Sequence, residues 1–158
     1  MESLINLKKE LDAIVLLWLA TANSEGVPNV SPKELFILNH SGDLVIANIA
    51  SPKSLMNILE NPQVCISGIN IWKQKGIQYK GTAKIISPQE QQFKTIEKEF
   101  IPLNQGRFRI QHFFQIKIQQ TKKITAPSYF YYPSTTEEEQ IQFVKKRYFA
   151  NDLSTEKN

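Results

Sequence analysis

Strand-length apolar runs separated by short turns recur along most of this sequence, and they constrain its fold more than any other feature. Residues 76–86 alternate most clearly, because Ile77 and Tyr79 fall on one face of an extended chain and Gln78 and Lys80 on the other. The turns at 24–26 and 39–43 are short enough to join antiparallel neighbours. Strands are expected over residues 13–23, 29–38, 44–49, 64–71, 76–86 and 108–118. The pattern predicts a mainly β fold with short helices, built as a six-stranded antiparallel barrel.

Helical signals are shorter and lie between or outside these runs. Spaced leucines predict a first helix over residues 3–11, and Ser51 followed by Pro52 predicts a second that ends at Asn61-Pro62. The capping-box pattern at 87–90 predicts a third helix with Pro88 in its first turn, and a polar helix is expected over about 136–149. Strands and helices do not alternate regularly, so the pattern does not favour a doubly wound parallel sheet.

Length and charge limit the class of protein. With 158 residues, the chain is expected to form a single domain over 1–158, with a core at about 10–120 and a C-terminal extension, 121–158, of unclear role. The net charge of +4 is spread along the chain, which indicates a solvated basic surface rather than a nucleic-acid site. The longest apolar run, 13–22, is too short for a bilayer that needs about 20 residues, so no membrane partner is expected.

Cysteine and histidine offer little chemistry. Cys65 is the single cysteine, so an internal disulfide is excluded and a reducing, cytoplasmic location is favoured. Cys65 lies mid-strand and is expected to be a buried structural thiol. His40 and His112 are the only histidines, and the sequence shows no metal-ligand spacing, so no metal site is predicted. His112 is expected to be a hydrogen-bonded histidine of the core or of an interface.

The start of the second helix is the most informative candidate site. The first amides of a helix lack internal partners and lie at the positive end of its dipole, where a phosphate can bind. Here the amides of Lys53 and Ser54, the charge of Lys53 and the hydroxyls of Ser51 and Ser54 would provide the contacts. An ordinary helix cap followed by a surface lysine is the alternative, and these residues alone favour that alternative.

An ordered set of motifs adds to this interpretation. The segments are Trp18–Ala22 with Glu25–Lys33, then Ile46–Asn48 with Ser51–Ser54 and Glu60–Pro62, then Gly76–Ala83. Together they resemble the pyridoxamine 5'-phosphate oxidase-like, FMN-binding split-barrel family, over about residues 10–120. The resemblance implies a split β-barrel that binds flavin mononucleotide (FMN), as a homodimer with the flavin at the interface.

The resemblance also implies which residues bind the cofactor. Asn29, Val30, Ser31 and Lys33 would line the isoalloxazine ring, with Lys33 near its pyrimidine end. Ile46, Ala47 and Asn48 would add a second strand, and Ser51, Lys53 and Ser54 would hold the phosphate. The partner subunit would contribute Trp72 and Gln78. No side-chain acid or base is implied, so no catalytic residue is assigned beyond flavin tuning by Lys33.

The implied function is a flavin-dependent oxidoreductase that acts on an unknown small molecule or electron donor. Pro52 stands where family members that oxidise pyridoxamine phosphate usually carry arginine, and the C-terminal segment lacks their basic, tryptophan-containing sequence. Vitamin B6 oxidation is therefore not expected. The alternatives are a non-enzymatic flavin carrier, electron-transfer protein or sensor, and a binder of another cofactor such as a deazaflavin or haem. The sequence shows no obvious histidine near the implied cofactor site that could be an axial ligand of haem iron, and this weighs against haem.

Overall fold

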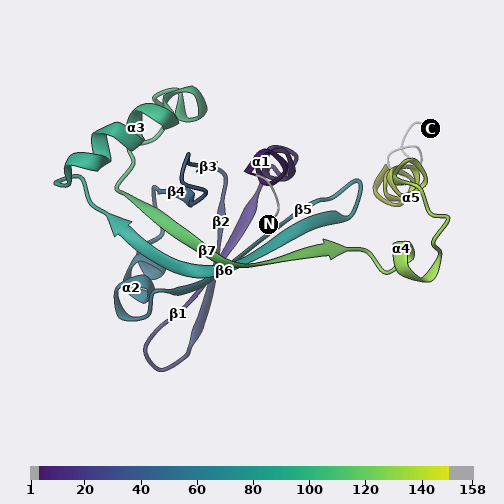
Figure 1. The fold of residues 1–158 in the computed structure, drawn as a ribbon, viewed down its shortest axis with the longest axis horizontal. Helices are drawn as coiled ribbons and strands as arrows, with labels where there is room; N and C mark the ends of the chain where they lie inside the picture. Colours follow the sequence, from purple (N-terminus) through teal and green to yellow (C-terminus); the bar gives the residue numbers. More distant parts are fainter. Residues whose placement is uncertain (1–3, 150–158) are drawn as a thin grey trace, which may run out of the picture.

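The computed structural model describes residues 4–149 and contains seven strands and five helices in that range. Their order and bounds are α1 (Leu4–Asp12), β1 (Leu17–Ala22), β2 (Pro28–Lys33), β3 (Phe36–Leu38), β4 (Leu44–Asn48), α2 (Pro52–Glu60), β5 (Gln63–Asn70), β6 (Lys75–Ile86), α3 (Gln91–Asn104), β7 (His112–Thr125), α4 (Ser128–Tyr131) and α5 (Glu137–Phe149). Figure 1 shows the long strands β6 and β7 crossing the molecule, with α3 at one end and α4 and α5 at the other.

All strands form one antiparallel sheet in the order β2-β1-β5-β6-β7-β4-β3. The sheet curls into a half-barrel, as expected for a mainly β split barrel, but it has seven strands rather than six. The expected strand 29–38 is two strands, because the chain leaves β2 after Lys33 and enters β3 at Phe36. β2 and β3 are the two edges of the sheet, so residues 34 and 35 cross from one edge to the other. We call this crossing the seam.

Apolar side chains fill both faces of the curled sheet. On the inner face, α1 and α2 pack against strand residues such as Leu17, Leu19 and Ile66, which are fully buried. On the outer face of β4 and β7, α3 covers a second cluster in which Phe113 lies 4.9 Å from the ring centroids of both Phe93 and Phe100. The inner cluster therefore fixes the positions of β1, β2 and α2, which carry the candidate site.

Several element boundaries differ from the sequence-based expectations. β1 begins at Leu17 rather than at residue 13, because Ile14 donates its N–H to the Leu11 carbonyl in the turn that follows α1. The strand expected over 108–118 begins at His112 and continues to Thr125, so the sheet extends into the segment assigned to the C-terminal extension. The short helix α4 was not expected.

The helix starts differ as well. Glu90 accepts the Ser87 N–H at 2.9 Å, but this closes a turn that precedes α3, which begins at Gln91, so Pro88 is not in a helix. A reciprocal capping box is found instead at α5, where Thr136 and Glu139 bond each other's backbone N–H. In residues 4–149, no helix is long and apolar enough to cross a membrane.

Candidate functional site

A cluster of polar side chains joins β2 to the start of α2. Successive side chains of β2 point to opposite faces of the sheet, and Asn29, Ser31 and Lys33 point towards the inner face. Their register partners on β1 are Thr21, Leu19 and Leu17, respectively. The hydroxyls of Ser31 and Ser54 are hydrogen-bonded at 2.9 Å, and the Asn29 amide donates to Ser54 Oγ at 3.3 Å. Ser54 is fully buried although it lies in the first turn of a helix. The contacts expected separately for a strand and a helix start therefore belong to one cluster.

Ser51 takes an unexpected role in this cluster. It occupies the N-cap position of α2, but its side chain makes no capping hydrogen bond. Its hydroxyl instead accepts a hydrogen bond from the Lys33 amino group. The Ser51 N–H is held by Asn48 Oδ1 at 3.1 Å, and Asn48 is itself buried at the end of β4. The expectation that Ser51 is an ordinary side-chain cap is therefore wrong, because the lysine across the seam uses its hydroxyl.

Lys33 is an ammonium group in an unfavourable position. The residue is 5% exposed, and burial lowers the pKa of its amino group from 10.5 to about 8. Among the described residues no carboxylate pairs with it, and Ser51 is its single hydrogen-bond partner. It also faces the start of α2, the positive end of that helix dipole. A negatively charged group at this point would satisfy Lys33 and the free amides of α2 together.

The other residues expected to bind the cofactor do not all join this cluster. Lys53 is exposed and makes no hydrogen bond or ion pair within the described part of the chain, so it is free to meet a ligand from the solvent side. Ile46 is buried in the inner core, whereas Ala47 lies under α3 on the opposite face. These two can support β4, but neither presents surface in this single chain.

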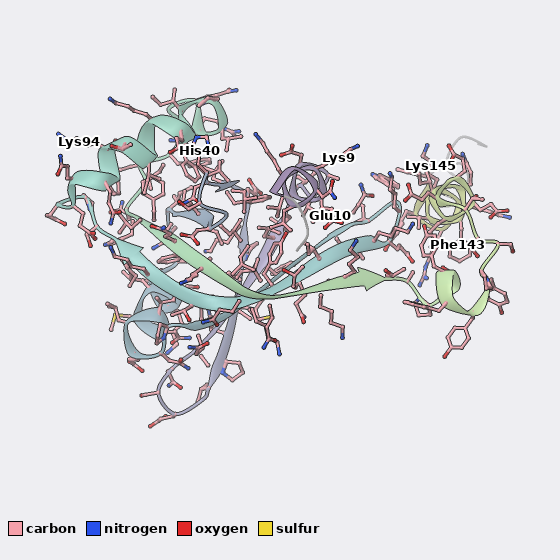
Figure 2. The ribbon with its side chains drawn as sticks, viewed as in Figure 1. Lys9, Glu10, His40, Lys94, Phe143 and Lys145 are labelled. Atoms are coloured by element: carbon pink, nitrogen blue, oxygen red, sulfur yellow. The ribbon has the colours of Figure 1, made fainter. Side chains whose placement is uncertain are left out.

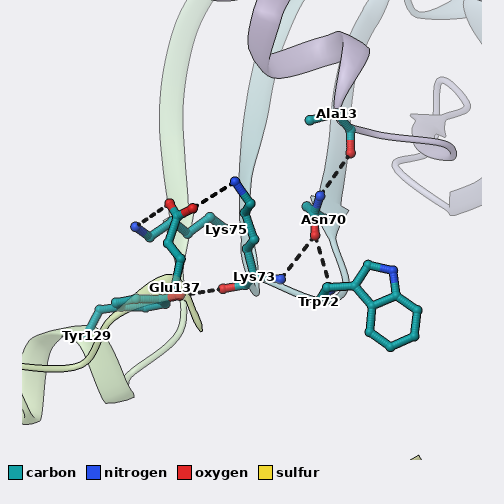
Figure 3. A network of polar contacts seen from close by, with 7 residues as sticks. All are labelled: Ala13, Asn70, Trp72, Lys73, Lys75, Tyr129 and Glu137. Carbon is teal, nitrogen blue, oxygen red and sulfur yellow. Dashed lines mark hydrogen bonds and ion pairs between the residues drawn. The ribbon is translucent and has the colours of Figure 1, made fainter. Parts of the chain in front are cut away.

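Val30, Trp72 and Gln78 belong to the outer face or to the β5–β6 turn. Val30 is 56% exposed on the side of β2 opposite Lys33. Gln78 pairs with Ser67, and Ser67 pairs with Trp18, so Gln78 and Trp18 share the outer face. Trp72 follows β5, where its N–H is held by Asn70 Oδ1 (Figure 3), and its ring stacks on Phe149 with centroids 6.0 Å apart. The expected residues thus divide between two faces of the sheet.

The outer face also carries an apolar groove of about 510 Å³. The lining includes Val15, Trp18, Ile69 and Ile71, which are 86%, 47%, 39% and 57% exposed, and also Trp72. Such a concentration of exposed apolar side chains is typical of a surface that another molecule covers.

Two residues of the region were missed or misjudged from the sequence. Asn57 is 1% exposed and donates to Thr21 Oγ1 at 3.0 Å, so α2 turns Ser54 and Asn57 inwards and leaves Leu59 64% exposed. The i, i+3 spacing of Ser51, Ser54 and Asn57 was the available signal. His112 was expected to be hydrogen-bonded, but its Nδ1 is buried without a partner among the described residues, opposite Asn48 in the sheet.

Cys65 also departs from its expected role. It is partly exposed rather than buried, because it lies on the outward face of β5 opposite Ala20 and Lys80. Within residues 4–149, no three histidine, cysteine, aspartate or glutamate side chains group closely enough to hold a metal ion.

Solved structures of other proteins share this fold. An FMN-binding protein from Syntrophomonas wolfei has a TM-score of 0.64 and 16% identity, with 78% of this chain and 86% of that chain covered. The haem storage protein HutZ from Vibrio cholerae has a TM-score of 0.58 and 19% identity, with 77% and 92% covered. At these identities the likeness shows the fold alone.

Sequence comparison gives a partial relative and a family. An uncharacterized protein of Methanocaldococcus jannaschii, MJ0282, is 41% identical over 71 residues, which are 44% of this chain and about half, 47%, of that relative's length. The family model described as pyridoxamine 5'-phosphate oxidase matches residues 5–124. This range includes the whole sheet except Thr125, the last residue of β7. The chain therefore belongs to the pyridoxamine 5'-phosphate oxidase family.

Proposed function

We propose that this protein binds FMN, with the phosphate held between Lys33 and the first turn of α2. The observation that carries the proposal is the buried Lys33 ammonium, which has no carboxylate partner among the described residues and faces a helix start. Desolvating a charge without a counter-charge destabilises a fold, so a site of this kind is expected to have a ligand that supplies the missing anion.

The residues present fit a phosphate monoester. The Leu55 N–H is already bonded to the Ser51 carbonyl, and Pro52 has none, so the amides of Lys53 and Ser54 are the first-turn donors left without a helix partner. Lys53 is exposed, whereas Ser54 is buried beside Ser31. Lys53 adds an exposed charge beside them, and Lys33 adds a buried one. A phosphate carries nearly two charges and three acceptor oxygens, which matches two ammonium groups and two amides.

A bound flavin would supply one- and two-electron redox chemistry, and the protein would orient it and tune its potential. We therefore infer an oxidoreductase that acts on a small molecule or electron donor, with a flavin carrier as the alternative within the same site. The family match and the FMN-binding relative support the cofactor. The single cysteine supports a reducing, cytoplasmic location.

We further propose that the protein is a homodimer that buries the apolar groove of the outer face. In a two-fold dimer the same surface of each copy meets its counterpart, and Trp18, which is 47% exposed in the groove, is a large aromatic side chain suited to anchor such an interface. Covering this face would also bring Val30, Trp72 and Gln78 of one subunit against its partner. This arrangement would let both faces of the sheet contribute to a flavin site, as the family resemblance implies.

Haem binding is the second candidate function. One structural relative is a haem storage protein, and His112 has a buried, unpartnered Nδ1 near the start of α2. Neutral imidazole is a common haem iron ligand. The Lys33 site favours FMN, because a phosphate matches its charges and hydroxyls better than an iron porphyrin does.

Calorimetry with FMN, riboflavin and FAD tests the proposal, alongside the visible spectrum of the purified protein. FMN is expected to bind in the micromolar range or tighter, and riboflavin at least about tenfold more weakly, since one lost charge-assisted hydrogen bond is about 1.5 kcal/mol. Equal affinity for FMN and riboflavin would show that no phosphate site exists at α2. A Soret band that saturates at one haem per chain and requires His112 would favour the second candidate.

A further inference from the structure

A second cavity lies between α1, the end of the β5–β6 hairpin and the C-terminal helices. It has a volume of about 740 Å³, within the usual range for small-molecule sites. Its lining shares no residue with the Lys33 cluster. α4 and α5 form one wall, and they follow residue 124, where the family match ends. The cavity therefore depends on a segment that the family match does not include.

Positive charge exceeds negative charge in this cavity. Four lysines and two glutamates line it, and the lysines are Lys9, Lys73, Lys75 and Lys123. Lys9 belongs to the last turn of α1 and makes no ion pair in the described part of the chain. Figure 2 shows Lys9 and Glu10 on α1, across from the C-terminal helices. The cavity is thus suited to an anion.

A carboxylate of the chain itself already neutralises part of this positive charge. Glu137 lies between Lys73 at 2.7 Å and Lys75 at 3.0 Å (Figure 3), and these lysines lower the pKa of its carboxyl group. Both ion pairs are about 40% exposed, a setting in which such pairs contribute little to stability. An incoming anion can therefore replace the Glu137 carboxylate at small cost.

The rest of α5 does not depend on Glu137. The Thr136–Glu139 capping box closes the helix start, and Gln140 binds Gln74 at 2.8 Å and Ser128 at 2.9 Å. Tyr129 donates its hydroxyl to the Lys73 carbonyl at 2.8 Å and lies 4.3 Å beneath the Lys75 ammonium. The Lys73 backbone and the Lys75 ammonium therefore keep these contacts whether or not Glu137 is bound to the lysines.

Glu10 adds a hydrogen-bond acceptor to the same cavity. Its Oε1 is 3.6 Å from the Lys123 ammonium, while its Oε2 is buried and has no hydrogen-bond partner among the described residues. The Glu10 side chain as a whole is 35% exposed, so its carboxylate can accept a hydrogen bond from a donor on a ligand. Ile14, Ile124 and Phe130 complete the lining with apolar surface.

We propose that this cavity binds a small organic acid that also carries a hydroxyl or amine, with the acid at Lys73 and Lys75, where it replaces the Glu137 carboxylate, and the donor at the Glu10 carboxylate. The apolar lining indicates a ligand with a flat or branched hydrocarbon body between these two groups. This site is additional to the proposed FMN site and does not depend on it.

The probe is 4-hydroxybenzoate, compared with its methyl ester, which lacks the charge, and with 4-methoxybenzoate, which lacks the donor. Binding is followed by ligand-observed and protein chemical-shift NMR, and a millimolar dissociation constant is expected for so small a ligand. The methyl ester is expected to bind about threefold to tenfold more weakly, as for a partly exposed charge pair. The loss for 4-methoxybenzoate is expected to be about tenfold, because its missing hydrogen bond is one to a carboxylate. No binding of 4-hydroxybenzoate at about 10 mM would overturn the proposal.

Variants separate a ligand site from a structural ion pair. Glu137→Gln should increase the affinity for 4-hydroxybenzoate about threefold, because it removes the competing carboxylate, whereas Lys73→Met and Lys75→Met should each decrease it by a similar factor. Lys84→Met is the matched control, since Lys84 also pairs with a glutamate, at 3.6 Å, but lies outside the cavity. Unchanged or weaker binding by Glu137→Gln, with α5 shown to remain helical and docked by NMR, would refute the displacement of Glu137.

Two further measurements keep the outcome distinct from that of the FMN proposal. Lys33→Met should leave 4-hydroxybenzoate binding unchanged, because Lys33 does not line this cavity. If Glu137→Gln does loosen α5, the salt dependence of wild-type binding still tests whether the cavity binds an anion. The affinity of the acid should fall between low and high ionic strength while that of the methyl ester stays constant, and equal behaviour of the two would refute an anion site.

Discussion

Replacing Lys33 by methionine should make the protein more stable and, at the same time, unable to hold FMN tightly. Methionine has a similar length and no charge, so it can fill the space beside Ser51 without the desolvation that lowers the Lys33 pKa. That pKa falls from 10.5 to about 8, and at about 1.4 kcal/mol per tenfold change in proton affinity the buried charge costs the fold about 3 kcal/mol near pH 7.

The substitution also removes one hydrogen bond to the Ser51 hydroxyl, which offsets about 1 kcal/mol of the gain. The net expectation is an increase of about 2 kcal/mol in the free energy of unfolding, or a rise in Tm of about 4–8 °C for a domain of this size. Thermal and urea unfolding of the ligand-free protein measure it. Lys53→Met is the matched control, because Lys53 is an exposed lysine in the same helix turn and its replacement should change Tm little.

The pH dependence gives a second check on the same residue. Between about pH 8 and 10.5 the unfolded chain keeps the Lys33 proton while the folded chain has released it, so the stability of the wild type rises through this interval. Lys33→Met lacks this contribution. Its advantage should therefore be full below about pH 8 and should disappear near pH 10.5. A variant that is less stable than the wild type at pH 7 would refute the view that Lys33 is an uncompensated charge.

Other substitutions and conditions test the remaining parts of the site. Lys53→Ala should weaken FMN about threefold to tenfold and leave riboflavin unchanged; equal loss for both ligands in calorimetry would place Lys53 away from the phosphate. FMN affinity of the wild type should fall as pH rises above about 8, where unliganded Lys33 loses its proton, whereas riboflavin affinity should stay level in the same titration. Ser54→Ala should lower the free energy of unfolding by about 1–2 kcal/mol, because it leaves Ser31 and Asn29 without a buried partner; an unchanged urea midpoint would show that water replaces the hydroxyl. Trp18→Glu should give a monomer by light scattering, and a persistent dimer would locate the interface elsewhere.

The strand pattern of the sequence was sufficient for the fold class because it follows from local chemistry. Alternation in residues 76–86 and the turns at 24–26 and 39–43 depend on neighbours in sequence, and the structure confirms a mainly β split barrel. The break between Lys33 and Phe36 was not predicted. Residues 34 and 35 carry no turn signal such as glycine or proline, and the break arises because the curled sheet places its two edges close enough for the chain to cross.

Helix ends were predicted less well than helix positions, since capping patterns compete with tertiary contacts. Ser51 has the right identity for a cap, yet the Lys33 amino group uses its hydroxyl. Ser87 and Glu90 form half of the predicted box, but the chain continues as a turn before α3. In both cases the residues typical of a helix start are present in the sequence. The hydrogen bond from Lys33 in the first case, and the turn before α3 in the second, determined which hydrogen bonds these residues make.

The seam explains why a lysine on a strand and a serine at a helix start, 18 positions apart, meet in one site. β2 ends at one sheet edge with Lys33 turned inwards, and the crossing delivers the chain to β3 and β4 at the other edge. β4 ends at Asn48, whose side chain holds the Ser51 N–H and so sets the direction in which α2 begins. Lys33 can reach Ser51 because both flank the split of the barrel. At the split of the barrel, an ammonium with no carboxylate partner among the described residues therefore faces a helix start. That location, rather than either residue alone, is what makes an anion the expected occupant.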